Sequence, residues 1–153
     1  MSKTRLITVK ADAELQYNWA VGRYGSRFFA ALRDEKKILG IRCPKCGRVY
    51  CPPRQVCGPC FTKMDEWVEL SDEGTLDAFS IVNYGFIDPN TGEPRPVPYT
   101  YAYVKLDGAD VTLTHIVDEQ DPARLQLGVR VKAVFREDRT GTIQDIDHFE
   151  VIG

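Results

Sequence analysis

The sequence has no apolar run that approaches the roughly 18–20 residues needed to cross a membrane as a helix. No long apolar stretch follows the first five residues, so we expect no secretory signal and no membrane segment, and therefore a cytoplasmic protein. A length of 153 residues is too short for a TIM barrel or for a dinucleotide-binding dehydrogenase of the usual size. Hydrophobic residues make up 43% and charged residues 27%, which is the composition of a globular domain with a core.

Histidine is scarce, which limits both histidine-based catalysis and histidine-rich metal sites. The two histidines are His115 and His148. Both fall in segments with the pattern of β-strands, and neither has a nucleophile beside it in the sequence. We therefore expect each to be a hydrogen-bonded strand residue, and we expect no independent catalytic activity from this chain.

Acidic residues are absent from one segment of the chain, residues 36–63. Residues 64–153, in contrast, carry 18 acidic and seven basic residues, a balance of −11. A uniform domain does not separate its charges in this way, so the pattern predicts a boundary near residue 63. The seven basic residues of the first segment are Lys36, Lys37, Arg42, Lys45, Arg48, Arg54 and Lys63.

Four of the five cysteines form two close pairs, Cys43 with Cys46 and Cys57 with Cys60, and ten residues separate the pairs. Each C-x-x-C can turn tightly around a metal ion and supply two thiolates, and ten residues suffice for a connecting hairpin. Four thiolates then fill a tetrahedral shell that has no open position. We predict a structural zinc ion at these four residues, which supplies much of the folding energy of a small module.

Other interpretations of the cysteines are weaker. A rubredoxin-type iron site uses the same four ligands, and the spacing does not distinguish it from zinc. Disulfides suit exported proteins, and two neighbouring pairs chelate a metal more readily than they act as a redox pair. The fifth cysteine, Cys51, has no histidine nearby in the sequence to activate it, so we expect a small buried residue inside the hairpin.

The basic segment keeps a surplus of positive charge after the metal is considered. Zinc with four thiolates has a formal charge of −2, which leaves about +5 on residues 36–63. Part of this surplus stabilises the thiolates. The remainder can meet a phosphate-rich ligand or an acidic surface of a partner.

The pattern before the cysteines predicts two helical pieces. Residues 14–21 fit the first piece, and Gly22 and Gly25 interrupt the pattern. Ser26 is expected to cap a second helix that has one apolar face. The large side chains of this arm, which either pack on their own domain or dock on a partner, are Tyr17, Trp19, Tyr24, Phe28, Phe29 and Leu32.

The pattern after the cysteines predicts five strands. They are residues 74–84, 101–106, 111–117, 129–135 and 142–152. A loop rich in turn residues, 88–98, follows the first strand, and Asp121 with Pro122 predicts a helical turn between the third and fourth strands. Five strands with a helical element at this position match a Greek-key barrel of the OB type.

The sequence therefore predicts a fold that is mainly β with N-terminal helices, in which a rubredoxin-like zinc ribbon is followed by a five-stranded OB-fold barrel. We expect an N-terminal helical arm over residues 1–35 and a zinc ribbon over residues 36–70. The OB-fold domain is expected over residues 71–153. The chain shows no internal repeat.

Several motifs together carry a family resemblance. They are residues 22–32, 40–47, 52–54 and 57–60 in the first half, and 74–75, 98–99 and 127–132 in the barrel half. The combination resembles the zinc-ribbon/OB-fold accessory proteins associated with thiolases and HMG-CoA-synthase-like enzymes. The resemblance covers roughly residues 15–150, and the ribbon is its specific part. Cys51 departs from it, because the family is expected to have a larger aromatic residue there.

The resemblance implies a non-catalytic accessory subunit of an acyl-CoA C-acyltransferase of the thiolase type. It implies a thiolase-fold protein subunit as the partner, which supplies the nucleophile and the acid/base groups, and CoA or an acyl-CoA as a ligand shared with that partner. The expected contacts to CoA are Arg48, Arg54, Arg95 and Tyr99, because arginine suits phosphate groups. The aromatic residues expected around the pantetheine arm, or alternatively in the barrel core, are Phe79, Tyr84, Phe86 and Tyr99.

Two other functions stay open. Zinc ribbons and OB folds both bind nucleic acids, but the balance of −11 in the barrel half would repel backbone phosphates, which disfavours a nucleic-acid partner. The second alternative is a pure scaffold that never contacts CoA. Such a scaffold would turn its basic segment toward an acidic surface of its partner.

Overall fold

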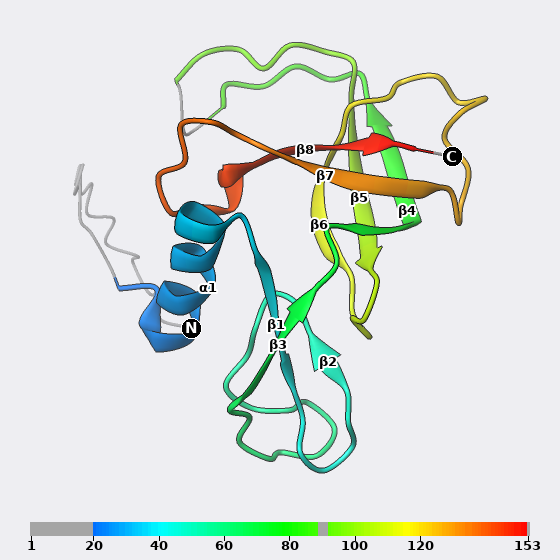
Figure 1. The fold of residues 1–153 in the computed structure, drawn as a ribbon. Helices are drawn as coiled ribbons and strands as arrows, with labels where there is room; N and C mark the ends of the chain where they lie inside the picture. Colours follow the sequence, from blue (N-terminus) through cyan, green and yellow to red (C-terminus); the bar gives the residue numbers. More distant parts are fainter. Residues whose placement is uncertain (1–19, 89–91, 153) are drawn as a thin grey trace, which may run out of the picture.

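The computed structural model describes residues 20–88 and 92–152, which form one α-helix, a small sheet and a barrel (Figure 1). The helix α1 spans Gly22–Glu35 and leads into the small sheet. The strands of this sheet are β1 (Ile38–Arg42), β2 (Val49–Tyr50) and β3 (Glu66–Leu70). They lie in the order β2-β1-β3, and both pairings are antiparallel. No helix among the described residues has the length and apolarity of a membrane span.

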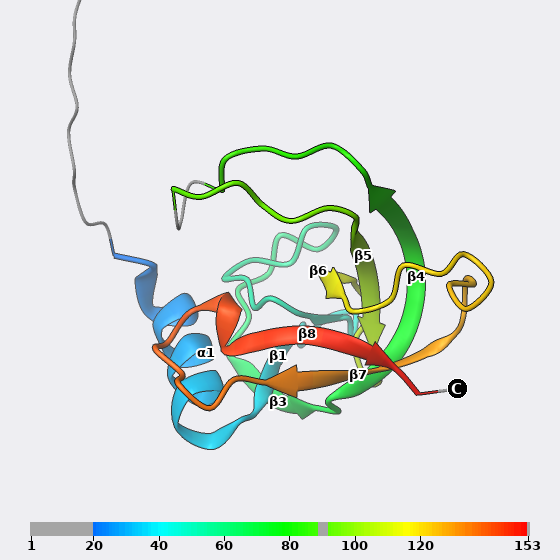
Figure 2. The same ribbon diagram turned by 90° about the horizontal axis from the view of Figure 1, so that it is seen from above.

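The remaining strands close into a five-stranded barrel in the order β4-β5-β6-β8-β7, which Figure 2 shows as a ring beside α1. They are β4 (Glu73–Val82), β5 (Tyr99–Leu106), β6 (Leu113–Val117), β7 (Arg130–Phe135) and β8 (Ile146–Val151). Neighbours pair antiparallel except β6 and β8, which run parallel. The prediction of a mainly β chain, with a ribbon followed by a five-stranded barrel of the OB type, is confirmed.

Strand β5 shows how the sequence specifies the barrel. Successive side chains of a strand point to opposite faces, so a period of two places one set inside and the other outside. β5 buries Thr100, Ala102, Val104 and Leu106 and exposes Tyr101, Tyr103 and Lys105. Gly74 of β4 packs so closely against this strand that a Cβ at its position would clash with the backbone of Lys105 and Leu106.

The helix α1 joins the ribbon to the barrel through a shared core. Phe28 and Leu32 are 1% and 0% exposed. They belong to one cluster with Ile38 and Leu70 of the small sheet and with Phe149 of the barrel. For Phe28, therefore, the expectation that the aromatic arm packs on its own domain is confirmed. Burial of a side chain of this size contributes roughly 1.5–3 kcal/mol, which makes α1 a structural part of both units.

Aromatic contacts fix the other side of α1 to the ribbon. The Tyr24 ring stacks on Trp67 with 5.7 Å between the ring centroids, and the Tyr24 hydroxyl donates a hydrogen bond to the Met64 carbonyl at 2.8 Å. The Arg27 guanidinium lies 4.5 Å from the centre of the same Trp67 ring. Tyr17 and Trp19, the other aromatic residues of the predicted arm, lie outside the described residues.

The predicted break within the helix is wrong. α1 runs without interruption from Gly22 through Gly25 and Ser26, so Ser26 caps nothing. A single glycine inside a helix costs about 1 kcal/mol, and burial of the apolar face of α1 outweighs that cost. Most of the first predicted piece, residues 14–19, lies outside the described residues, and its last two residues precede α1.

Two of the predicted strands begin two or more residues too early. β6 starts at Leu113 rather than Val111, because Asp110 is hydrogen-bonded to the ribbon. The Asp110 carboxylate accepts from the Val49 N–H at 2.8 Å, and the Asp110 N–H donates to the Val49 carbonyl at 2.9 Å. The last strand was expected from residue 142, but a short 3₁₀-helix, η1 (Ile143–Asp145), precedes β8.

The turn that Asp121 was expected to cap is present. The Asp121 carbonyl accepts from the N–H groups of Arg124 and Leu125 at 3.0 and 3.1 Å. Its carboxylate accepts from the Ala123 N–H at 2.9 Å. A carboxylate that satisfies a free N–H at the start of a helical turn is the usual role of aspartate at this position.

The turn before η1 depends on Asp145, a carboxylate that is only 1% exposed. It accepts from the N–H groups of Thr140 and Gly141 at 2.8 Å and of Thr142 at 3.3 Å.

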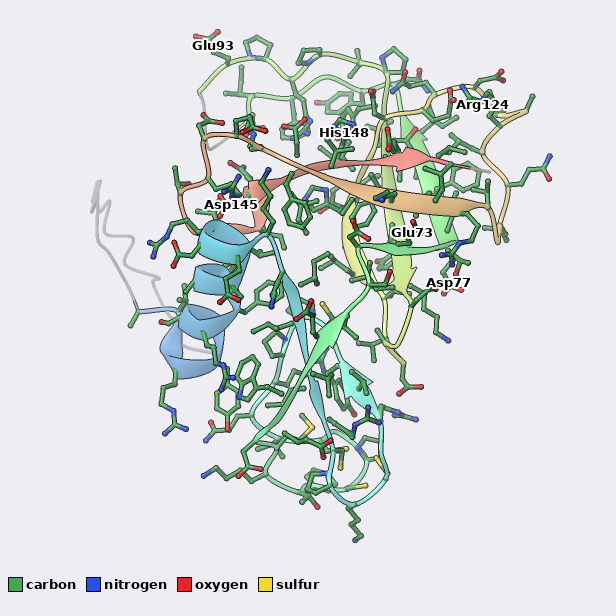
Figure 3. The ribbon with its side chains drawn as sticks, in the orientation of Figure 1. Glu73, Asp77, Glu93, Arg124, Asp145 and His148 are labelled. Carbon is green, nitrogen blue, oxygen red and sulfur yellow. The ribbon has the colours of Figure 1, made fainter. Side chains whose placement is uncertain are left out.

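Asp145→Ala leaves these donors without their acceptor, so we expect the free energy of unfolding to fall by about 2–3 kcal/mol. Urea unfolding followed by circular dichroism measures this. The matched control is Asp77→Ala at an exposed position of β4 (Figure 3), which should change stability by less than about 0.5 kcal/mol. Equal losses in the two variants would contradict the assigned role.

Candidate functional site

The paired cysteines meet in the ribbon, away from the barrel, where sulfur atoms gather in Figure 3. Each pair lies on a turn of the same construction, a zinc-knuckle turn. In the first knuckle the Gly47 N–H donates to the Cys43 carbonyl at 2.9 Å, and in the second the Phe61 N–H donates to the Cys57 carbonyl at 2.9 Å. The four sulfur atoms that lie within 4.8 Å of one another belong to Cys43, Cys46, Cys57 and Cys60.

The spacing of the sulfur atoms fits one tetrahedral metal ion. The Sγ atoms of Cys46 and Cys57 are 3.7 Å apart. A disulfide bond would require about 2.05 Å. Two thiolates on one zinc ion, each bonded at about 2.3 Å, lie about 3.8 Å apart in tetrahedral geometry. Cys43 and Cys57 are also buried, so their thiolates need a cation beside them. The donor set therefore fits a structural zinc ion.

The four thiols cannot all ionise without such a cation. The Tyr50 hydroxyl, 3.4 Å from the Cys57 sulfur, lowers the pKa of Cys57 to about 6. The neighbouring Cys46, together with burial, raises the pKa of Cys60 to about 12. A metal ion at the centre would supply the positive charge that allows four thiolates to coexist.

Two of the predicted phosphate contacts, Arg48 and Arg54, lie beside this cluster. The Arg54 guanidinium is 5.5 Å from the centre of the Tyr50 ring. The Tyr50 hydroxyl, and then the charge on Cys46 and Cys57, raise the pKa of Arg48. Both arginines are exposed, and neither has an ion pair with a carboxylate in the described part of the chain.

The other two predicted contacts, Arg95 and Tyr99, lie on and after the long loop between β4 and β5. This loop is at the opposite end of the molecule from the knuckles (Figure 1). The Arg95 guanidinium lies 4.7 Å from the centre of the Tyr99 ring, and its Nη1 is 3.1 Å from the Asp88 carboxylate. The structure therefore brings Arg48 close to Arg54 and Arg95 close to Tyr99, but it separates the two pairs.

The aromatic residues that were expected around a pantetheine arm do not form one lining. Phe79 is partly buried and packs against the barrel core, whereas Tyr84 is exposed. Phe86 meets the edge of the Tyr99 ring, with 6.4 Å between the centroids. Core packing, the alternative for these residues, applies to Phe79.

Comparison with known families accounts for both halves of the chain. The model of the ChsH2 rubredoxin-like zinc ribbon domain matches residues 30–65, and that of the ChsH2 C-terminal OB-fold domain matches residues 67–136. A DUF35 domain-containing scaffold protein from Methanocaldococcus jannaschii is 34% identical over 112 residues, which cover 72% of this chain and 75% of the relative. The chain belongs to the DUF35 family.

Further relatives agree with this assignment. A DUF35 domain-containing scaffold protein from Methanothermobacter thermautotrophicus is 35% identical over 104 residues, 67% of this chain and 74% of the relative. The crystal structure of a DUF35-family protein from Sulfolobus solfataricus shares the fold with a TM-score of 0.61 and 24% identity, covering 86% of this chain and 87% of that one. The Ltp2-ChsH2(DUF35) aldolase has a TM-score of 0.62 and 20% identity, covering 88% of this chain and 98% of that one.

The two histidines of this DUF35 chain are strand residues, but only His148 matches the expectation fully. Its Nδ1 is 2.9 Å from the Asp147 carboxylate. His115 is 8% exposed, and its Nε2 lies 3.3 Å from the Ile143 carbonyl oxygen. Its Nδ1 is buried and has no hydrogen-bond partner within residues 20–88 and 92–152. Burial lowers the pKa of His115, so the ring is neutral at pH 7. A pocket of about 440 Å³ beside it is lined by Asp88, Arg95, Arg136, Gln144 and Asp147, among others.

Cys51 is the small buried residue that the sequence predicts. It is fully buried within the shared core. Burial raises the pKa of its thiol to about 12, so the nucleophilic thiolate form is not populated near neutral pH.

Phe61 is the residue of this DUF35 ribbon that the sequence analysis missed. It occupies the position after the second knuckle that Gly47 occupies after the first. Both residues have left-handed backbone conformations, with φ of 75° at Gly47 and 51° at Phe61. This conformation costs a residue other than glycine roughly 1–2 kcal/mol. Comparing the two C-x-x-C motifs residue by residue would have found it, because the motifs differ in the residue that follows them.

Elemental analysis of protein purified without added metal tests the proposed metal site. The full chain should contain about one zinc ion, as one four-sulfur site requires. Cys46→Ser should lose most of the metal and fold poorly, because the ribbon depends on the fourth ligand. Cys51→Ser is the matched control, and its metal content should equal that of the parent. Iron in place of zinc, or disulfides between the four cysteines, would contradict the assignment.

Proposed function

We propose that this chain is a non-catalytic accessory subunit that holds a thiolase-type enzyme in a complex and helps to position its CoA thioester. The observation that carries the proposal is the similarity to two DUF35 scaffold proteins over 75% and 74% of their lengths. A relative of the same fold, the Ltp2-ChsH2(DUF35) aldolase, is named as a DUF35 protein together with an enzyme.

The metal centre supports a structural role. Four sulfur ligands would complete the tetrahedral shell of zinc, so a substrate would find no open position on the metal. The zinc would hold the two knuckles together. The residues that surround the cluster, Arg48, Arg54 and Tyr50, are suited to binding and to charge stabilisation.

The ribbon arginines are the better placed of the predicted CoA contacts. CoA carries a 3′-phosphate and a pyrophosphate, and Arg48 and Arg54 are exposed cations without a carboxylate partner in the described part of the chain. Arg95, in contrast, is already paired with Asp88. We therefore assign the phosphates to the ribbon pair and propose that Arg95 and Tyr99 organise the loop between β4 and β5.

A nucleic-acid partner is less favoured. Residues 64–153 carry a balance of −11, and repulsion of backbone phosphates by the barrel would oppose the attraction of the ribbon.

Among thiolases, benzoylsuccinyl-CoA thiolase is the partner type to test first, because the sequence resembles its small subunit. None of the residues described above selects an aromatic acyl group.

Co-expression with a thiolase-fold enzyme from the same organism tests the accessory role. The two chains should elute together in size-exclusion chromatography, and the enzyme should lose activity or stability when this chain is omitted. Deleting residues 1–35 would be a poor test, because it removes Phe28 and Leu32 from the core. An enzyme with full activity and stability on its own would refute the proposal.

Calorimetry of CoA with the complex tests the proposed phosphate contacts. Arg48→Ala and Arg54→Ala should each weaken CoA binding about 5-fold, the loss expected when one solvent-exposed ionic contact of about 1 kcal/mol is removed. One of the two arginines is expected to contact the 3′-phosphate, which dephospho-CoA lacks. The variant without that arginine should therefore bind dephospho-CoA with the same affinity as the parent complex. Arg95→Ala should have a smaller effect, and Arg124→Ala on the far side of the barrel is the matched control (Figure 3). If every variant binds both ligands like the parent, the subunit is a scaffold without CoA contact.

A further inference from the structure

We propose that the second knuckle of the ribbon is a docking surface for an acidic surface of the partner protein, with Phe61 as its aromatic anchor. The docking surface consists of the hairpin from Gln55 to Met64, from which the Phe61 and Val56 side chains protrude. The inference rests on the accessory role proposed above and specifies where the partner enzyme attaches.

Within the part of the chain that the structure describes, the Phe61 side chain is left almost entirely unpacked. The ring is 85% exposed. Its backbone makes the same N–H to carbonyl hydrogen bond as Gly47 in the first knuckle, so glycine would close the turn without strain. The other non-glycine residue with a positive φ in the described chain, Lys36, ends α1 and forms ion-pair contacts there. A strained backbone that presents an unpacked aromatic ring indicates a use outside the isolated chain.

The hairpin that carries Phe61 is closed by backbone hydrogen bonds and is partly apolar. It is closed by hydrogen bonds from Cys57 N–H to the Thr62 carbonyl and from Met64 N–H to the Gln55 carbonyl, both 2.9 Å. Two of the four clustered cysteines belong to it, so a bound metal ion would fix its shape. Val56 is half-exposed on the same hairpin, paired with Lys63 across it. An exposed aromatic ring on a hydrogen-bonded turn, with an aliphatic residue on the same hairpin, is the kind of anchor that dominates protein interfaces.

The charges around the hairpin define the chemistry of the partner. Basic residues of the ribbon that lie near acidic elements are paired: Lys36 with Glu137, Lys37 with Glu69 and Arg42 with Glu66. The two basic residues of the knuckles that are not proposed to contact CoA, Lys45 and Lys63, have no carboxylate partner within the described ranges. An apolar pocket that accepts one ring, surrounded by carboxylates, complements this surface. Nucleic acid does not, because the acidic barrel would oppose it.

The experiment measures the dissociation constant between the full metal-loaded chain and the purified thiolase-fold partner, without CoA, by biolayer interferometry. Phe61→Gly and Phe61→Asn, which both tolerate the left-handed conformation, should weaken the complex at least 10-fold. Phe61→Gly should also raise the melting temperature of the free chain, by about 3 °C, because it relieves the backbone strain. A residue that merely stabilised the fold would lower it. Leu127→Ala, an exposed apolar residue of the barrel, is the matched control and should leave the dissociation constant unchanged.

Charge variants test the acidic character of the partner. Lys63→Ala should slow association and make it less sensitive to salt, because cations at the edge of an interface act mainly on the rate of encounter. Lys105→Ala, which removes an exposed cation of the barrel, should change neither quantity.

The possible outcomes separate the two proposals. If the parent chain forms no complex, the accessory role itself is overturned. If the complex forms and Phe61→Gly binds as tightly as the parent, the docking surface is overturned and the accessory role stands. Self-association of the chain that Phe61→Gly abolishes would assign the surface to a second copy and overturn the assignment to the partner enzyme. Binding of a 30-nucleotide single-stranded DNA that Phe61→Gly weakens would likewise overturn it.

Discussion

The ribbon depends on bringing four sulfur atoms to one point. Its own apolar core consists of Ile41, Cys43, Tyr50, Cys57 and Met64, and two of these five buried residues are cysteines of the metal-binding cluster. A core of this size cannot compensate for the conformational entropy of two knuckles and a two-residue strand. Coordination of a metal ion would supply the missing free energy, and it would also fix the side chains that surround the cluster, because their backbone belongs to the same turns.

The ribbon is joined to the barrel by a shared core and by hydrogen bonds, rather than by a linker alone. Phe28 and Leu32 of α1 are buried in a core that both units share. On the other side, Asp110 of the barrel forms two hydrogen bonds with Val49 of β2. Because the two units are packed together, a partner that binds the knuckles also fixes the orientation of the barrel and of its long loops. This coupling suits a subunit that positions one part of a complex relative to another.

The features that the sequence predicted correctly are those determined by local spacing. Two C-x-x-C pairs dictate a knuckle whatever surrounds them, and a period of two dictates a half-buried strand such as β5. The errors arose where tertiary contacts decide. Ser26 has the chemistry of a helix cap, but burial of the helix face carries α1 through it. Thr142 does cap a helical turn, η1, in a segment that was expected to be extended.

The residues that were predicted to contact CoA show the same division. Arg48 and Arg54 are close in sequence to the cysteines and lie beside them in space, whereas Arg95 belongs to a distant loop that no local pattern could place. Phe61 was missed for a different reason. Its signal is a difference between two similar motifs, and its meaning depends on two quantities that only the structure gives, the sign of φ and the exposure of the ring.

The distribution of ion pairs leaves the two ends of the molecule with net charges of opposite sign. Two arginines of the barrel half are neutralised internally: Arg130 pairs with Asp107 at 2.7 Å and lowers the pKa of that carboxyl, and Arg136 pairs with Asp147 at 2.9 Å. Because the acids of the barrel outnumber its bases, these pairs leave a surplus of negative charge there. The knuckles carry the opposite surplus. An acidic partner is therefore attracted by one end of the molecule and repelled by the other, so a long-range field selects the orientation before any contact forms. In the proposed complex, the partner therefore already approaches the knuckles, and close contact with the Phe61 ring completes the binding.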